Sequence, residues 1–73
     1  MMRTGLRLED AIVYVLATAG HGMSTAAIAF VINQNRIHIR RDGRPVTDAQ
    51  VYAAIMRHPS IFVKEGRLIH MLM

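Results

Sequence analysis

The sequence contains no cysteine, which excludes disulfide cross-links and thiolate metal sites. It also contains no apolar run near the roughly 20 residues that a membrane-spanning helix needs. The longest candidates, residues 11–19 and 26–32, are separated by the polar and glycine-containing residues 20–24. Glu9 and Asp10 lie where the apolar core of a secretory signal should begin. We therefore expect a soluble, cytoplasmic protein with no membrane partner.

Patterns typical of catalytic and cofactor sites are also missing. No nucleophile has an adjacent base, no two carboxylates form a close pair, and no glycine loop has a phosphate-binding form. The four histidines, at positions 21, 38, 58 and 70, have no metal-ligand spacing. We expect no enzymatic activity, no small-molecule substrate, no cofactor and no metal, with His58 at the edge of the core.

What the chain does contain is apolar residues and arginine. Its 73 residues are 52% hydrophobic, enough for one domain with an ordered core over about residues 6–72. Nine Lys and Arg against five Asp and Glu give a net charge of +4, and eight of the nine cations are arginine. The arginine side chain suits phosphate and guanine recognition, although small proteins are also basic by chance.

Two helices are expected in the first half. Apolar residues at helical spacing predict a helix over residues 8–19, which Gly20 and Gly22 end. Ser24 is placed as the N-cap of a second helix, with Met23 and Ile28 as a hydrophobic staple. The expected inward stripe of this helix is Ile28, Val31, Ile32 and Asn35.

The second half predicts a third helix and a hairpin. Residues 37–39 alternate like a short strand, and residues 40–45 read as a turn. Thr47 and Gln50 form a capping-box pattern, Val46 and Val51 a staple, and Pro59 stops the helix. The expected inward stripe is Val51, Ala54, Ile55 and His58. Residues 61–64 and 67–72 flank Glu65-Gly66, a two-residue hairpin turn that would place Lys64 directly opposite Arg67.

This order predicts an α+β fold, a small winged helix-turn-helix: three helices, a C-terminal β-hairpin wing, and a short strand between the second and third helices. In such folds the third helix enters the major groove of DNA. A generic three-helix bundle with an added hairpin has the same order of elements.

Four stretches resemble the HARE-HTH group of winged helices, which occurs in eukaryotic chromatin proteins, an RNA polymerase delta subunit and bacterial restriction-linked proteins. They are residues 8–20 with their Ala-Ile-x-x-Val-Leu core, Gly22-Met23-Ser24-Thr25 followed by Ile28, Arg41 to Val46 with Gln50-Val51, and Phe62 with Gly66. The third is similar to the bacterial branch. The resemblance implies a non-enzymatic DNA-binding or chromatin-adaptor module in transcription regulation or a restriction- or chromatin-type system. We expect a lone module that occupies DNA, dimerises or recruits another protein.

The predicted DNA-contacting residues fall in three places. The outward face of the third helix offers base-contact candidates: Gln50, Arg57, Ala49 and Ala53, with Met56 beside them. Phosphate-contact candidates are Arg40, Arg41 and Arg44 in the preceding turn, Thr47 at the helix start, and Lys64 and Arg67 on the wing. The alternatives are that Gln50 and Thr47 only cap the helix, that Arg57 is a solvated charge, that Asp42 neutralises the turn, and that Glu65 disfavours an anion at the wing.

Some apolar residues lack an inward position. Val13 and Tyr14 fall on the back of the first helix, and Phe30 falls opposite the stripe of the second. Exposed apolar patches usually bind something. They therefore support a second hypothesis, a winged helix that docks a protein partner or homodimerises without binding DNA. Five of the eight arginines lie at positions 36–44 and 57, around the third helix, which favours DNA.

Overall fold

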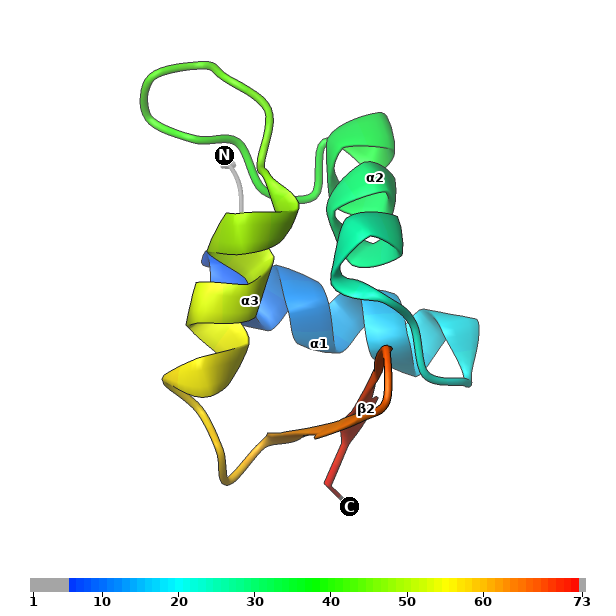
Figure 1. Ribbon diagram of the computed structural model, residues 1–73. Helices are drawn as coiled ribbons and strands as arrows, with labels where there is room; N and C mark the ends of the chain where they lie inside the picture. The colour runs from blue at the N-terminus through cyan, green and yellow to red at the C-terminus, as the bar shows by residue number, and fades with distance from the viewer. Residues whose placement is uncertain (1–5, 73) are drawn as a thin grey trace.

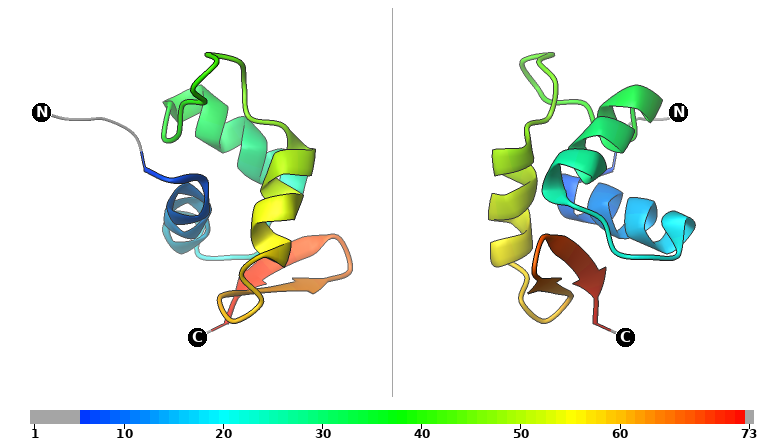
Figure 2. Two further views of the ribbon diagram at one scale, coloured as in Figure 1. Left: turned by 90° about the vertical axis from the view of Figure 1, so that its left-hand side faces the viewer. Right: turned by 45° about the vertical axis from the view of Figure 1, so that its right-hand side comes forward.

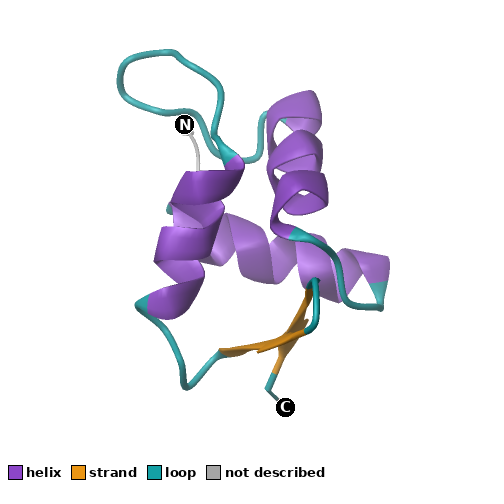
Figure 3. Cartoon of the chain, in the orientation of Figure 1, coloured by secondary structure: helices purple, strands orange, loops and turns teal. Residues whose placement is uncertain are grey.

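The computed structural model describes residues 6–72 as a small α+β domain with the winged-helix order. Three helices, α1 (Leu8–Ala19), α2 (Thr25–Asn35) and α3 (Asp48–Met56), precede two strands, β1 (Phe62–Glu65) and β2 (Leu68–Met71). Figure 1 shows α2 and α3 standing side by side across α1, with the strands below them. Figure 3 shows that a long loop joins α2 to α3.

The first helix has the predicted bounds, and its end follows from backbone conformation. Ile12, Val15 and Leu16, which lie at helical spacing, are buried together with Ala11. Gly20 adopts a φ of 75°, and its N–H donates to the carbonyl of Leu16. This left-handed stop costs little at glycine because there is no Cβ to clash.

The predicted caps of α2 and α3 are confirmed. The Ser24 side chain accepts from the Ala27 N–H, and Thr47 and Gln50 form both bonds of a capping box. The inward face of α3 is confirmed for Val51, Ala54 and Ile55, which are buried. The remaining expected stripe residues are less buried: His58 and Val31 are half-buried and Asn35 is exposed, whereas Ala29 belongs to the core.

The hairpin forms, but its predicted turn was wrong by one residue. Glu65 pairs with Leu68 and Lys64 with Ile69, so the two turn residues are Gly66 and Arg67. Gly66 has a φ of 63° and Arg67 a negative one, the pattern of a type II′ turn with glycine first. A turn centred on Glu65-Gly66 would need a left-handed Glu65. Lys64 therefore does not face Arg67.

The predicted strand at residues 37–39 is absent from the described chain. The N–H of Ile37 donates to the Ile32 carbonyl at the end of α2, and its carbonyl accepts from Leu6. The hairpin is instead extended by Met23, between α1 and α2, which exchanges two backbone hydrogen bonds with Ile69 at 3.1 and 2.7 Å.

The core lies where the three helices meet the inner face of the hairpin. Phe62 and Ile69 close it from the hairpin, and Ile12, Ile28 and Ile32 are fully buried inside it. Over residues 6–72, none of the helices combines the length and apolarity needed to cross a membrane.

Candidate nucleic-acid interface

The exposed side of α3 is an apolar stripe. We call Ala49, Tyr52, Ala53 and Met56 the outer stripe, since all four are exposed and their i, i+3, i+4, i+7 spacing puts them on one side of the helix. Tyr52 and Met56 are 44% and 58% exposed. The predicted outward face did not include Tyr52. Its sequence position could have placed it there, because it lies three residues after Ala49 and four before Met56, and such spacings share one side of a helix.

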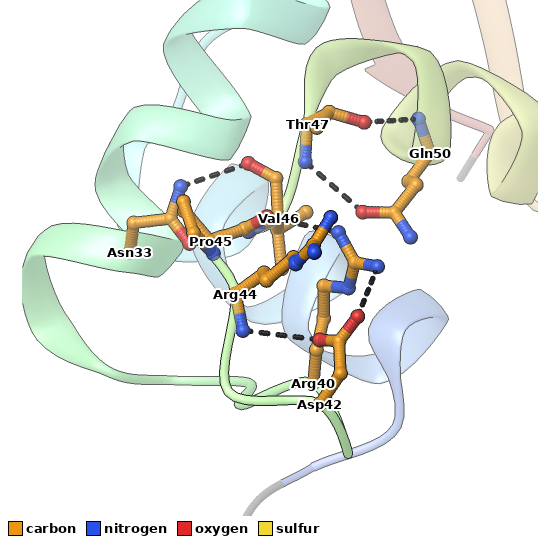
Figure 4. A network of polar contacts seen from close by, with 8 residues as sticks. All are labelled: Asn33, Arg40, Asp42, Arg44, Pro45, Val46, Thr47 and Gln50. Carbon is orange, nitrogen blue, oxygen red and sulfur yellow. Dashed lines mark hydrogen bonds and ion pairs between the residues drawn. The ribbon is translucent and has the colours of Figure 1, made fainter.

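Asn33 holds the start of α3 against α2. Its side-chain amide donates to the Val46 carbonyl at 2.9 Å, and its Oδ1 accepts from the Val46 N–H at 2.8 Å (Figure 4). One side chain thereby satisfies both backbone groups of the residue that precedes the Thr47 cap. This pair of bonds fixes the point at which α3 begins, and so the direction of the outer stripe.

Arg40 braces the loop before α3. Its guanidinium donates to Asp42 Oδ2 at 2.7 Å and to the Pro45 carbonyl at 3.2 Å, and Asp42 Oδ1 accepts from the Arg44 N–H (Figure 4). The Arg40 side chain is only 26% exposed. Of the three predicted cations in this loop, Arg40 is thus engaged within it, and within residues 6–72 Asp42 forms its ion pair with the Arg40 guanidinium.

Arg41 and Arg44 are the available cations of this loop. Both are exposed, and neither forms an ion pair within residues 6–72. Arg44 also lines a hollow of about 240 Å³ together with Arg36, whose left-handed φ of 53° ends α2. The segment between α2 and α3 therefore presents three exposed guanidinium groups, those of Arg36, Arg41 and Arg44.

Of the polar candidates at the two ends of α3, Thr47 and Gln50 are hydrogen-bonded within the protein, whereas the Arg57 side chain is exposed. The Thr47 N–H donates to Gln50 Oε1 at 3.1 Å, and Thr47 Oγ1 accepts from the Gln50 N–H at 3.2 Å (Figure 4). The Thr47 N–H and the side-chain Oε1 of Gln50 are thus engaged in the cap. Arg57 is exposed at the C-cap and has no ion pair in the described chain.

The wing separates its two predicted cations. Lys64 Nζ donates to the Gly66 carbonyl at 2.6 Å and so braces the turn, whereas Arg67 is exposed within the turn. Glu65 Oε1 lies 3.6 Å from His70 Nε2. Arg67 is the cation that the wing leaves available.

These cationic positions surround α3. In the left view of Figure 2, α3 stands between the α2–α3 loop above and the hairpin below, and the hairpin turn projects on the side away from α1. Arg41 and Arg44 belong to the loop, Arg57 follows the end of the helix, and Arg67 lies in the projecting turn. The result is an apolar helix face with arginines in the flanking segments.

The predicted interface residues lie on other surfaces. Tyr14 and Phe30 are 54% and 65% exposed, whereas Val13 is half-buried and packs against the core. Tyr14 lines a groove of about 430 Å³ between α1 and α2, which Val31 and Ile37 line from the other side. The groove does not include Phe30 among its lining residues, so the structure does not unite the three candidates in one patch.

No protein-family model, no curated protein and no solved structure matches the chain. The HARE-HTH resemblance therefore remains a prediction from the residues, and the fold and the geometry around α3 are the basis for assigning a function.

Proposed function

We propose that the protein is a non-enzymatic module that binds double-stranded DNA, with α3 in the major groove and with the α2–α3 loop and the wing on the phosphate backbone. The observation that carries this proposal is that five arginines, 36, 41, 44, 57 and 67, are exposed and form no ion pair in residues 6–72, and that four of them, 41, 44, 57 and 67, belong to the segments around α3. They lie before, after and beside one helix whose outer face is unobstructed.

The dimensions of α3 fit this role. An α-helix with its side chains is about 10–12 Å across, and the major groove is about 12 Å wide, so the nine-residue α3 fits into it. Ala49 and Ala53 have short side chains, so the backbone of α3 can approach the bases closely at these two positions of the outer stripe. Asp48, in the first turn, is the one acidic residue on α3, and its charge favours contacts farther along the helix.

Arg41, Arg44 and Arg67 would contact phosphates, and Arg57 a base edge or a phosphate at the end of α3. Phosphate contacts release counterions, so affinity depends on salt. With three phosphate contacts, log K plotted against log salt has a slope of about −3. A fluorescence-anisotropy titration of a mixed-sequence duplex at several salt concentrations measures this slope. Failure to bind any duplex at low salt contradicts the proposal.

Single variants test which cations are involved. We expect Arg44→Ala to weaken binding to all sequences alike and to reduce the salt slope by about 0.9. Arg7→Ala is the control, because it removes the same formal charge from an exposed residue at the N-cap of α1, which lies 3.8 Å from Glu9 and outside the proposed interface. Equal losses from both variants would mean that net charge alone, and no defined face, attracts the DNA.

A second candidate function is protein docking or homodimerisation, which the exposed aromatic rings of Tyr14 and Phe30 favour. An analytical sizing measurement separates the two candidates. A dimer that Phe30→Ser dissociates, in a protein without DNA affinity, would support the second one.

A further inference from the structure

The outer stripe presents apolar groups where a DNA-reading helix usually presents hydrogen-bonding ones. Met56 and Tyr52 provide its exposed bulk, and Ala49 and Ala53 provide methyl groups between them. The stripe carries no charged side chain. Its one polar group is the Tyr52 hydroxyl, at the tip of an aromatic ring.

Hydrogen-bonding readers of base edges lie outside the stripe. Bidentate recognition of adenine needs both ends of a glutamine or asparagine amide. The side-chain Oε1 of Gln50 already accepts from the Thr47 N–H, and Gln50 is half-buried. Arg57 follows the last helical residue. The central turns of α3 therefore offer van der Waals contact rather than a hydrogen-bond code.

The major groove contains one apolar group, the C5-methyl group of thymine, and alanine and aromatic side chains are among those that contact it. The exposed arginines in the segments before and after α3 and in the wing turn make a polyanion the complementary occupant for this face. An uncharged apolar partner would leave them unpaired.

We propose that the outer stripe reads the C5-methyl groups of thymine, so that the protein favours duplexes with thymine in the major groove facing α3. This inference rests on the proposed DNA binding and adds its specificity. Met56 and Tyr52 make the main methyl contacts, and the two alanines allow the approach.

The test compares two duplexes of identical A·T-rich sequence, one with thymine and one with deoxyuridine at every thymine position. The two have the same charge and the same hydrogen-bonding groups and differ only in the C5-methyl groups. We expect tighter binding to the thymine duplex, by about fourfold for each methyl group contacted. Equal affinities for the two duplexes would overturn the inference and leave DNA binding intact, whereas no binding to either duplex would overturn DNA binding itself.

Variants locate the effect on the stripe. Met56→Ala and Tyr52→Ala should each lower the ratio of the affinity for the thymine duplex to that for the deoxyuridine duplex. For Met56→Ala this ratio should approach one. Arg67→Ala is the control, because it should weaken binding to both duplexes and leave the ratio unchanged. Tyr52 and Met56 are both exposed, so the urea unfolding of the two variants should match that of the wild type. Such a match would exclude a folding defect. A dimer in solution that Met56→Ala dissociates would assign the stripe to a second copy of the chain and overturn the inference.

Discussion

At the scale of single residues, Asn33 shows how one side chain determines the site. In the sequence it lies where the apolar pattern of the second helix fades, and nothing in that pattern marks it. In the structure it forms two hydrogen bonds with the backbone of Val46, 13 residues away. Sequence periodicity reports which residues face the core, and it contains no information about a polar partner across a loop.

We expect Asn33→Ala to lower the free energy of unfolding by about 2–3 kcal/mol, because it removes two hydrogen bonds and leaves two partly buried backbone groups unpaired. Urea denaturation measures the change. Gln34→Ala is the control, since Gln34 is the exposed neighbour on the same helix and should shift stability by no more than about 0.5 kcal/mol. Similar values for both variants would show that the Asn33 bonds contribute nothing.

The arginines give the same lesson for the candidate site. Arg40, Arg41 and Arg44 are equivalent in the sequence, where each is a cation in a predicted turn. The structure separates them, because Arg40 bonds to Asp42 and Pro45 whereas Arg41 and Arg44 stay exposed. The fold of the loop decides which of these arginines is hydrogen-bonded within the protein. The sequence therefore predicts which segment is positively charged, but not which of its arginines are available to contact a phosphate.

At the scale of elements, helices with local signals were predictable. The caps at Ser24 and Thr47 and the glycine stop at Gly20 involve residues at most four positions apart, so the pattern itself contains the interaction. The strand at residues 37–39 was wrong because alternation over three residues does not ensure an edge to pair with. The Met23 bridge to Ile69 could not be found in this way, since a single bridging residue has no periodicity.

The wing is attached to the body of the domain through close packing at Gly22. A Cβ added there would clash with the His70 ring, so the glycine allows that ring to rest against the segment before Met23. The His70 ring is the 37% exposed end of a side chain that can turn away, so we expect Gly22→Ala to destabilise the protein by no more than about 1 kcal/mol.

A double-mutant cycle tests this contact. With His70→Ala as background, Gly22→Ala should cost much less, because the ring that it displaces is absent. Thermal or urea unfolding of the four proteins gives the coupling. An unchanged cost in the His70→Ala background would trace the effect of Gly22→Ala to backbone freedom instead.

At the scale of the whole molecule, the fold class was predictable because caps, stripes and the hairpin glycine all indicate the same arrangement. The face that binds a partner was harder to assign. Exposed apolar side chains occur on α1, α2 and α3, and the sequence does not show which of them share a surface. The fold places Tyr14 and Tyr52 on different helices, and α3, which carries Tyr52, has exposed arginines in the loop before it, at its C-cap and in the wing turn.

If the loop and the wing contact the same duplex at separate phosphates, their contributions to binding are independent. Arg44→Ala and Arg67→Ala should then have additive effects on log K, because the two residues share no partner in the described chain. The double variant should lower the salt slope from about −3 to about −1. Anisotropy titrations of the four proteins measure both quantities. A double variant no weaker than Arg44→Ala would mean that loop and wing do not engage the duplex together, and that α3 does not lie in the groove with the wing beside it.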